Sequence, residues 1–140
     1  MTGTAWALAG ALKVALAVTF KTVATVEVVG AGDDRAASRL ETVVQADLDG
    51  LVACWAAAKP DDDEPLHFLT AIAKMNPLDG RIRRWDVSAA TGSEALDACL
   101  ADRAATWVIA PAPQFADRYR VTIRYAWVDE AGRLAAPPKP

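Results

Sequence analysis

Cys54 and Cys99 are the side chains whose chemistry constrains this chain most. Both fall in stretches that are predicted to be helical. They could remain buried thiols or, if the two helices pack on one sheet, pair with each other. A bridge would close a loop of about 45 residues, which the loop-entropy relation equates with about 4 kcal/mol of stabilisation. Such a bridge persists only in an oxidising compartment. The residues alone leave both states open.

The remaining reactive side chains form no catalytic arrangement. His67 is the only histidine, so a zinc site would need cysteines and carboxylates from separate elements. The serines lack a nucleophile-elbow sequence and have one histidine to serve as a base; they are Ser38, Ser88 and Ser93. We therefore expect no catalytic residue, no metal, no cofactor and no enzymatic activity.

One acidic stretch and one glycine-rich stretch were compared with known calcium-binding and phosphate-binding loops, and both differ from them. The run Asp61–Glu64 does not alternate its oxygen ligands and lacks the glycine of a calcium loop, so a solvated loop is favoured. The stretch Gly30–Gly32 lacks the third glycine of a phosphate loop, and the carboxylates of Asp33 and Asp34 would repel a phosphate. Neither stretch predicts a binding site.

The charge of the chain argues against nucleic acid as a partner. The formal net charge is -3 and the isoelectric point is near 5.1, whereas phosphate binding needs clustered lysine and arginine. The basic residues are scattered, apart from Arg81, Arg83 and Arg84, which alternate along a predicted strand and indicate a solvated sheet face. With 53% hydrophobic residues, the chain is apolar and long enough for one globular domain.

Residues 1–32 form a β-rich segment ahead of this domain. Apolar residues alternate with small or charged ones over Leu12–Phe20, and a second valine-rich run covers Val23–Val29, so extra strands are predicted. A secretory signal is the alternative, but no lysine or arginine precedes the apolar run and Lys13 interrupts it. No run reaches the roughly 18 apolar residues of a membrane-spanning helix, so any membrane anchor is expected outside this chain.

Residues 33–128 carry the pattern of one α+β domain. Apolar residues recur every three or four positions over Leu40–Trp55, which predicts one amphipathic helix that must end by Lys59, because a proline follows. The stretch Leu66–Val87 alternates around an Asn-Pro-Leu-Asp-Gly turn, which predicts a β-hairpin.

A second helix and a final strand complete the predicted domain. Thr91–Glu94 resembles a capping box, and it opens a helix that carries Cys99 and stops before Pro111. The stretch Arg118–Trp127 alternates apolar with basic residues, which predicts a strand with one buried face. Residues 129–140 are rich in proline and alanine and are expected to be a linker or a free end.

The order of these features resembles a known family. They are a helix ending in Cys54-Trp55, a hairpin turn with Pro77 and Asp79-Gly80-Arg81-Ile82, a capped helix with Asp97-Ala98-Cys99, then Trp107, a Pro-x-Pro and a closing strand. Together they are similar to the TonB-like C-terminal domain of the myxobacterial gliding-motility type, the AgmX/PglI C-terminal domain. The resemblance covers about residues 35–128. It departs at Trp55, where a tyrosine is commoner, and does not explain the N-terminal β-rich run.

The resemblance implies two helices packed on one face of a small antiparallel sheet. It also implies that Cys54 and Cys99 form a disulfide, and that the chain is a non-enzymatic, periplasmic or otherwise extracytoplasmic module of the cell envelope, of the kind found in gliding motility and TonB-type transport. Such a module would dock a protein partner, or a second copy of itself, through a sheet edge, because an unpaired edge pairs readily with another chain. The expected edge strand carries Tyr119, Val121, Ile123, Tyr125 and Trp127.

Two other interpretations stay open. A small-ligand-binding or enzymatic α+β domain would use a pocket between helices and sheet, with Trp55, Trp85 and His67 as its walls. A cytoplasmic domain of unrelated ancestry would keep both cysteines reduced.

Overall fold

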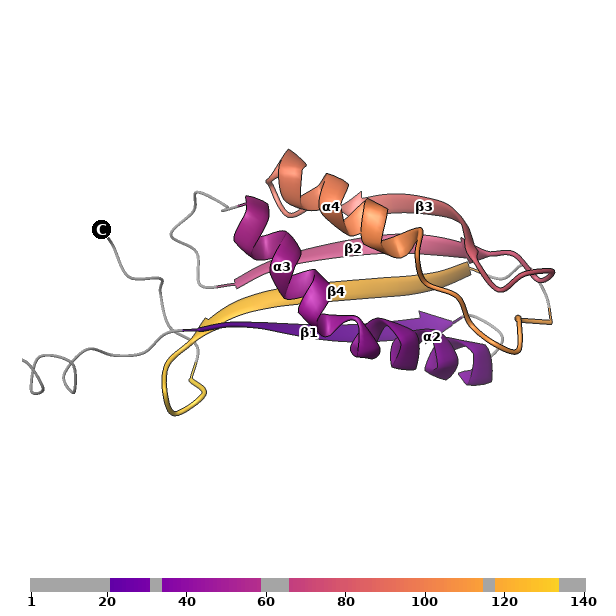
Figure 1. Cartoon of the computed structure of the whole chain (residues 1–140), viewed down its shortest axis with the longest axis horizontal. Coiled ribbons are helices and arrows are strands. Elements are labelled where there is room, and N and C mark those ends of the chain that lie inside the picture. The colour runs from indigo at the N-terminus through magenta and orange to yellow at the C-terminus, as the bar shows by residue number, and fades with distance from the viewer. Residues whose placement is uncertain (1–20, 31–33, 59–65, 115–117, 134–140) are drawn as a thin grey trace, which may run out of the picture.

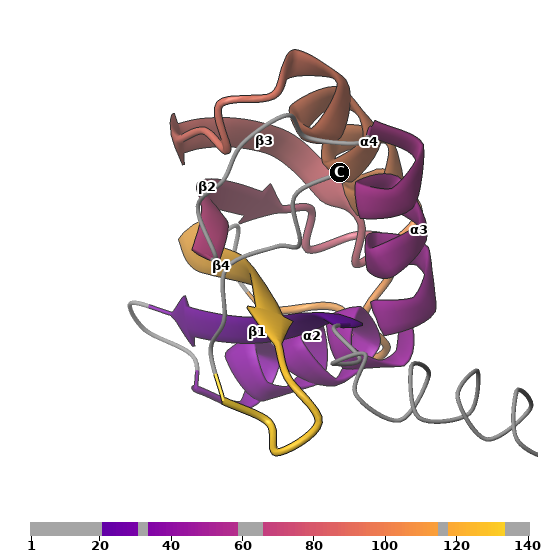
Figure 2. The same ribbon diagram turned by 90° about the vertical axis from the view of Figure 1, so that its left-hand side faces the viewer.

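The computed structural model describes residues 21–30, 34–58, 66–114 and 118–133, which form a four-stranded antiparallel sheet with helices against it. The strands are β1 (Lys21–Gly30), β2 (Leu66–Met75), β3 (Ile82–Ala89) and β4 (Arg118–Val128), and the helices are α2 (Asp34–Ala46), α3 (Leu48–Ala58) and α4 (Glu94–Ala104). The strand order across the sheet is β1-β4-β2-β3 (Figure 1). The three helices lie on the same face of the sheet, and no described helix or strand covers the other face (Figure 2).

The α+β prediction is confirmed, but the sheet carries three described helices where two were expected. The single helix predicted over residues 33–59 is interrupted at Asp47, which separates α2 from α3. The N–H of Asp47 donates to the carbonyl of Val44 at 3.0 Å, and the N–H of Leu51 donates to the carbonyl of Asp47 at 3.0 Å. Asp47 therefore closes one helix and opens the next.

The second N-terminal β-rich run is confirmed as a strand. β1 pairs with β4 along its whole length. At its end a Cβ atom on Gly30 would lie 2.8 Å from the ring of Tyr119, so glycine permits this close approach. The run Leu12–Phe20, predicted to be a strand or alternatively part of a secretory signal, lies outside the described residues. The acidic run Asp61–Glu64 also lies outside them.

The core lies between the helices and the sheet face that they cover. Because strand side chains alternate between faces, β4 gives every second residue to this core, and each of these is 0% exposed: Tyr119, Val121, Ile123 and Tyr125. The helices contribute fully buried leucines and a valine, spaced three or four positions apart within each helix: Leu40, Val44, Leu51, Leu96 and Leu100.

The turn between β2 and β3 confirms the predicted hairpin. The side chain of Asn76 accepts the N–H of Leu78 at 2.8 Å, and the side chain of Asp79 accepts the N–H of Arg81 at 3.0 Å. Gly80 has φ +71, and a Cβ atom there would collide with a backbone carbonyl. This position accordingly needs glycine.

The capping box before α4 is in the expected place, but its roles differ. Ser93 is the N-cap, and its hydroxyl accepts the N–H of Leu96 at 3.2 Å. Thr91, the expected cap, donates its hydroxyl to Asp97 at 2.7 Å. Asp97 also accepts the backbone N–H of Thr91 at 3.0 Å, so the carboxylate that reaches back from the helix is Asp97 and not Glu94.

Candidate functional site

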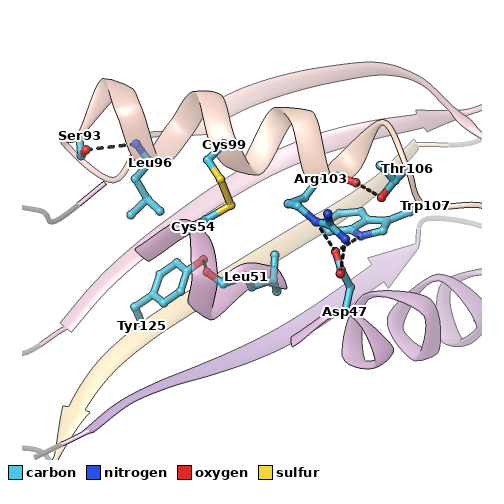
Figure 3. The surroundings of a disulfide bond; sticks show 10 residues. All are labelled: Asp47, Leu51, Cys54, Ser93, Leu96, Cys99, Arg103, Thr106, Trp107 and Tyr125. Atoms are coloured by element: carbon cyan, nitrogen blue, oxygen red, sulfur yellow. Dashed lines mark hydrogen bonds and ion pairs between the residues drawn. A yellow bond between two sulfur atoms is a disulfide. The ribbon is translucent and has the colours of Figure 1, made fainter. Parts of the chain in front are cut away.

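A disulfide joins α3 to α4 (Figure 3). The Cα atoms of Cys54 and Cys99 are 5.6 Å apart, and Cys54 is 1% exposed. The pairing that the resemblance implied is thus present. A disulfide of this kind indicates an oxidising compartment.

A polar cluster around Asp47 joins the same helix layer one turn further along α4. Arg103 donates from Nε to Oδ2 of Asp47 at 2.9 Å and also binds Oδ1 through Nη2, while Trp107 donates from Nε1 to Oδ2 at 2.8 Å (Figure 3). Burial by itself raises the pKa of Asp47, but the hydrogen bonds from Arg103 and Trp107 outweigh it and hold this pKa below its ordinary value. Asp47 is therefore an ionised anchor between the two parts of the chain.

Gly50 leaves the space that this cluster occupies. A Cβ atom on Gly50 would lie 2.5 Å from Oδ1 of Asp47 and 2.8 Å from Nε of Arg103. The sequence analysis did not predict this cluster. The signals available were this glycine within an apolar helix and an aspartate directly before Leu48, where an N-cap is favoured.

The aromatic residues considered as pocket walls lie in two separate clusters. Trp55 packs against His67 and Tyr125, with ring centroids 5.1 Å and 4.9 Å away. Trp85 packs against Trp107 at 5.8 Å. The β2 partner of Trp85 lies six residues beyond His67, which is about 20 Å along a strand. The three side chains do not line one pocket.

The strand expected at the edge lies in the interior of the sheet, so that prediction is wrong. β4 pairs with β1 on one side and with β2 on the other, which occupies both sets of its backbone groups. Its apolar side chains Tyr119, Val121, Ile123 and Tyr125 face the helices and are 0% exposed, and Trp127 pairs through its backbone with Thr22. Sequence alternation reports which face of a strand is buried, and it does not report which strands lie beside it.

One true edge of the sheet, β1, is closed by α2 around Val26 and Val28. The backbone N–H of Val28 donates to the carboxylate of Glu41 at 3.0 Å, and the side-chain amide of Gln45 donates to the carbonyl of Val26 at 3.4 Å. Outward backbone groups of β1 are thus already bonded to helix side chains.

The opposite edge, β3, is open along most of its length. Its start is covered by the segment after α4, where Arg81 bridges to Val108 and the N–H of Ile109 donates to the carbonyl of Gly80 at 2.9 Å. From Ile82 to Ala89, no described strand lies beyond β3. Val87 on this strand is 42% exposed.

Two further features bear on the kind of site. None of the described helices is long and apolar enough to span a membrane. Within the described ranges, no three histidine, cysteine, aspartate or glutamate side chains are grouped so as to hold a metal ion.

A scan against family models, a search of curated proteins and a search of solved structures each find no match for this chain. The TonB-like resemblance accordingly rests on the order of sequence features alone.

Proposed function

We propose that this chain is a non-enzymatic interaction module of the cell envelope, periplasmic or otherwise extracytoplasmic, and that it docks a protein partner by strand addition at β3. The observation that carries the proposal is the asymmetry of the two edges. α2 side chains occupy outward backbone groups of β1, whereas the described part of the chain places no strand beyond β3.

Strand addition suits the geometry of β3. An extended peptide beside it would form main-chain hydrogen bonds, and its alternate side chains would lie on the two sheet faces. On the helix-covered face the neighbouring side chains are Val87, which is 42% exposed, and Trp85, which packs against the buried Trp107. On the open face the neighbouring side chains are Arg84 and Asp86, which form an ion pair with Nε of Arg84 2.9 Å from Oδ2 of Asp86. A ligand that alternates aromatic and polar residues would match both faces.

The disulfide supports a periplasmic or otherwise extracytoplasmic location, because the Cys54–Cys99 bridge would be reduced in most cytoplasms. The TonB-like order of elements supports the same placement, and it supports docking at an edge. The edge is β3, however, and not the strand that the resemblance led us to expect.

The test is to select extended peptides from a random displayed library on the oxidised chain and to measure their affinity for β3 variants. Neighbouring residues in a strand point their N–H groups to opposite sides. Of Asp86→Pro and Val87→Pro, therefore, one removes an outward donor and the other breaks the ladder with β2. The variant that keeps the wild-type melting temperature is the informative one.

The selected peptides should lose at least tenfold in affinity on that variant. Equal affinity for the wild-type chain and the folded proline variant would contradict docking at β3. A concentration-dependent dimer of the chain alone, abolished by the same substitution, would identify a second copy as the partner.

A further inference from the structure

The sheet face opposite the helices carries a concentration of positive charge. Five cations from three neighbouring strands point to this open face: Lys74 on β2, Arg84 on β3, and Arg118, Arg120 and Arg124 on β4. The whole chain has a formal charge of -3. The surface charge is therefore strongly segregated, and we call these five residues the basic face.

The cations of the basic face are placed unfavourably for the isolated domain. Lys74 lies directly opposite Arg118 on one side and Arg84 on the other, and like charges at such cross-strand positions repel. Two described carboxylates share this face: Asp86 lies 2.9 Å from Arg84, and Glu27 lines the same hollow as Arg120 and Arg124. Five cations against two carboxylates leave the face with a net positive charge.

Apolar and hollowed surface accompanies this charge. Phe68 is 46% exposed and Val29 is 43% exposed on the same face. Three adjoining hollows of about 440, 330 and 320 Å³ follow β4, and neighbouring hollows share Arg120, Arg118 or Ile72 in their walls. The face therefore offers a continuous shallow groove with apolar contacts and cationic sides.

The terminal segments of this chain do not have the chemistry to cover the basic face. Residues 1–20 and 134–140 contain no aspartate or glutamate. Charge complementarity requires an anionic occupant, which neither of these two segments supplies.

We propose that the basic face binds an acidic amphipathic helix of a protein partner. A helix satisfies its own backbone hydrogen bonds, whereas an extended peptide lying on a sheet face would leave its polar backbone groups without partners. The exposed phenylalanine and valine suit the apolar stripe of such a helix. This surface shares Arg84 with the β3 edge, but its other four cations lie on β2 and β4, and binding there does not depend on docking at β3.

The spacing of the arginines defines the ligand. Arg118 and Arg120 are two residues apart on a strand, about 6.6 Å, and Arg124 lies about 13 Å beyond Arg120. Residues four apart on a helix are separated by about 6 Å along the axis. Carboxylates one turn and then nearly four turns from the first, about 20 Å along the helix, would therefore meet Arg118, Arg120 and Arg124 in succession.

The probe is a stapled, dye-labelled helical peptide with glutamates at this spacing and leucines on the adjoining stripe. Its controls are a peptide of identical composition in scrambled order, vesicles of phosphatidylcholine with phosphatidylglycerol, and a single-stranded oligonucleotide. Binding is measured by fluorescence anisotropy, or by sedimentation for the vesicles, on wild-type chain, Arg118→Gln/Arg120→Gln and Arg124→Gln. Arg133→Gln serves as the matched control for Arg124→Gln, because it also removes one positive charge, from a turn beyond β4 where Arg133 pairs with Asp129.

The ordered peptide should bind the wild-type chain at least tenfold more tightly than the scrambled peptide does. Arg118→Gln/Arg120→Gln should weaken it at least tenfold, Arg124→Gln should weaken it less, and Arg133→Gln should leave it unchanged. Equal binding of the scrambled peptide, or tighter binding of vesicles or oligonucleotide, would overturn the proposal. Self-association that Arg118→Gln/Arg120→Gln abolishes would also overturn it, since a second copy would then be the occupant.

Discussion

The carboxylate of Glu41 on α2 accepts the backbone N–H of Val28 on β1 at 3.0 Å. This bond links a helix to the outer edge of the sheet, where a neighbouring strand would otherwise pair. Gln45, one turn later on the same helix, reaches the carbonyl of Val26. The helix thereby blocks strand pairing around Val26 and Val28, which favours the opposite edge as the place for a partner.

Replacing Glu41 by Ala should expose that edge. Without the acceptor, the amide of Val28 loses its partner, so its hydrogen exchange should accelerate and stability should fall by about 1 kcal/mol. Amide exchange by NMR measures the first effect and urea denaturation the second. Glu41→Gln is the matched control, because its side-chain oxygen can still accept the bond. If Glu41→Ala leaves the exchange of Val28 unchanged, the bond does not close this edge.

The Cys54–Cys99 disulfide should supply a large part of the stability of the domain. Closing a loop of about 45 residues is worth about 4 kcal/mol on the loop-entropy relation, so Cys54→Ser/Cys99→Ser should unfold at a much lower urea concentration. Urea denaturation compares this variant with the oxidised wild-type chain.

Intact mass after alkylation in denaturant checks the pairing itself. The oxidised chain should gain no alkyl group until a reductant is added. Immediate alkylation of both cysteines would contradict the disulfide and remove the support it gives to an oxidising compartment.

Substituting Gly50 by Ala should destabilise the chain, which is the opposite of the usual effect within a helix. Alanine is normally favoured over glycine there by about 1 kcal/mol, but the new Cβ atom would lie 2.5 Å from Oδ1 of Asp47. Thermal unfolding of Gly50→Ala decides the sign. Ala53→Gly, at an exposed position of α3, gives the ordinary propensity effect for comparison. A higher melting temperature for Gly50→Ala would mean that Asp47 and Arg103 can move apart at little cost.

The Asp47 cluster should make stability depend on acid pH. The folded-state pKa of Asp47 lies below its ordinary value of 3.8, so its contribution is fully present above about pH 4 and is lost as pH falls through the folded-state pKa. Asp47→Asn should therefore cost about 1–3 kcal/mol at neutral pH. The difference from the wild-type chain should shrink below pH 4. Urea denaturation as a function of pH measures this, and a difference that stays constant down to pH 2 would exclude an ionised Asp47.

Neutralising the centre of the basic face should stabilise the free domain. Lys74 lies between Arg118 and Arg84, and removing repulsion between like charges across strands is worth a few tenths to about 1 kcal/mol. Lys74→Thr should accordingly raise the melting temperature, most clearly at low ionic strength. A lower melting temperature at low salt would show that the repulsion is already relieved within the chain.

The predictable parts of this fold were the local ones. The hairpin around Asn76–Gly80, the strand Arg118–Val128 and the helix that carries Cys99 each follow from alternation, turn residues or a cap within a few positions. The order of the strands in the sheet could not be predicted from the sequence. The pairing of β4 with both β1 and β2 depends on contacts between distant segments, and its alternating pattern would be the same at an edge or in the interior.

The helix break at Asp47 could not be predicted for a related reason. Its partners Arg103 and Trp107 are more than 50 residues away in the chain, so local periodicity favoured one continuous helix. The disulfide, in contrast, was anticipated through the resemblance, because spacing alone does not decide whether Cys54 and Cys99 meet.

Docking at β3 is tested most directly by amide hydrogen exchange of the oxidised chain, residue by residue, with and without a peptide selected on it. In the free chain, the outward amides of Ile82–Ala89 should exchange faster than the amide of Val28 and those of β4. The peptide should then protect β3 amides selectively. Protection of β1, or no protection of β3 at saturating peptide, would contradict docking at this edge.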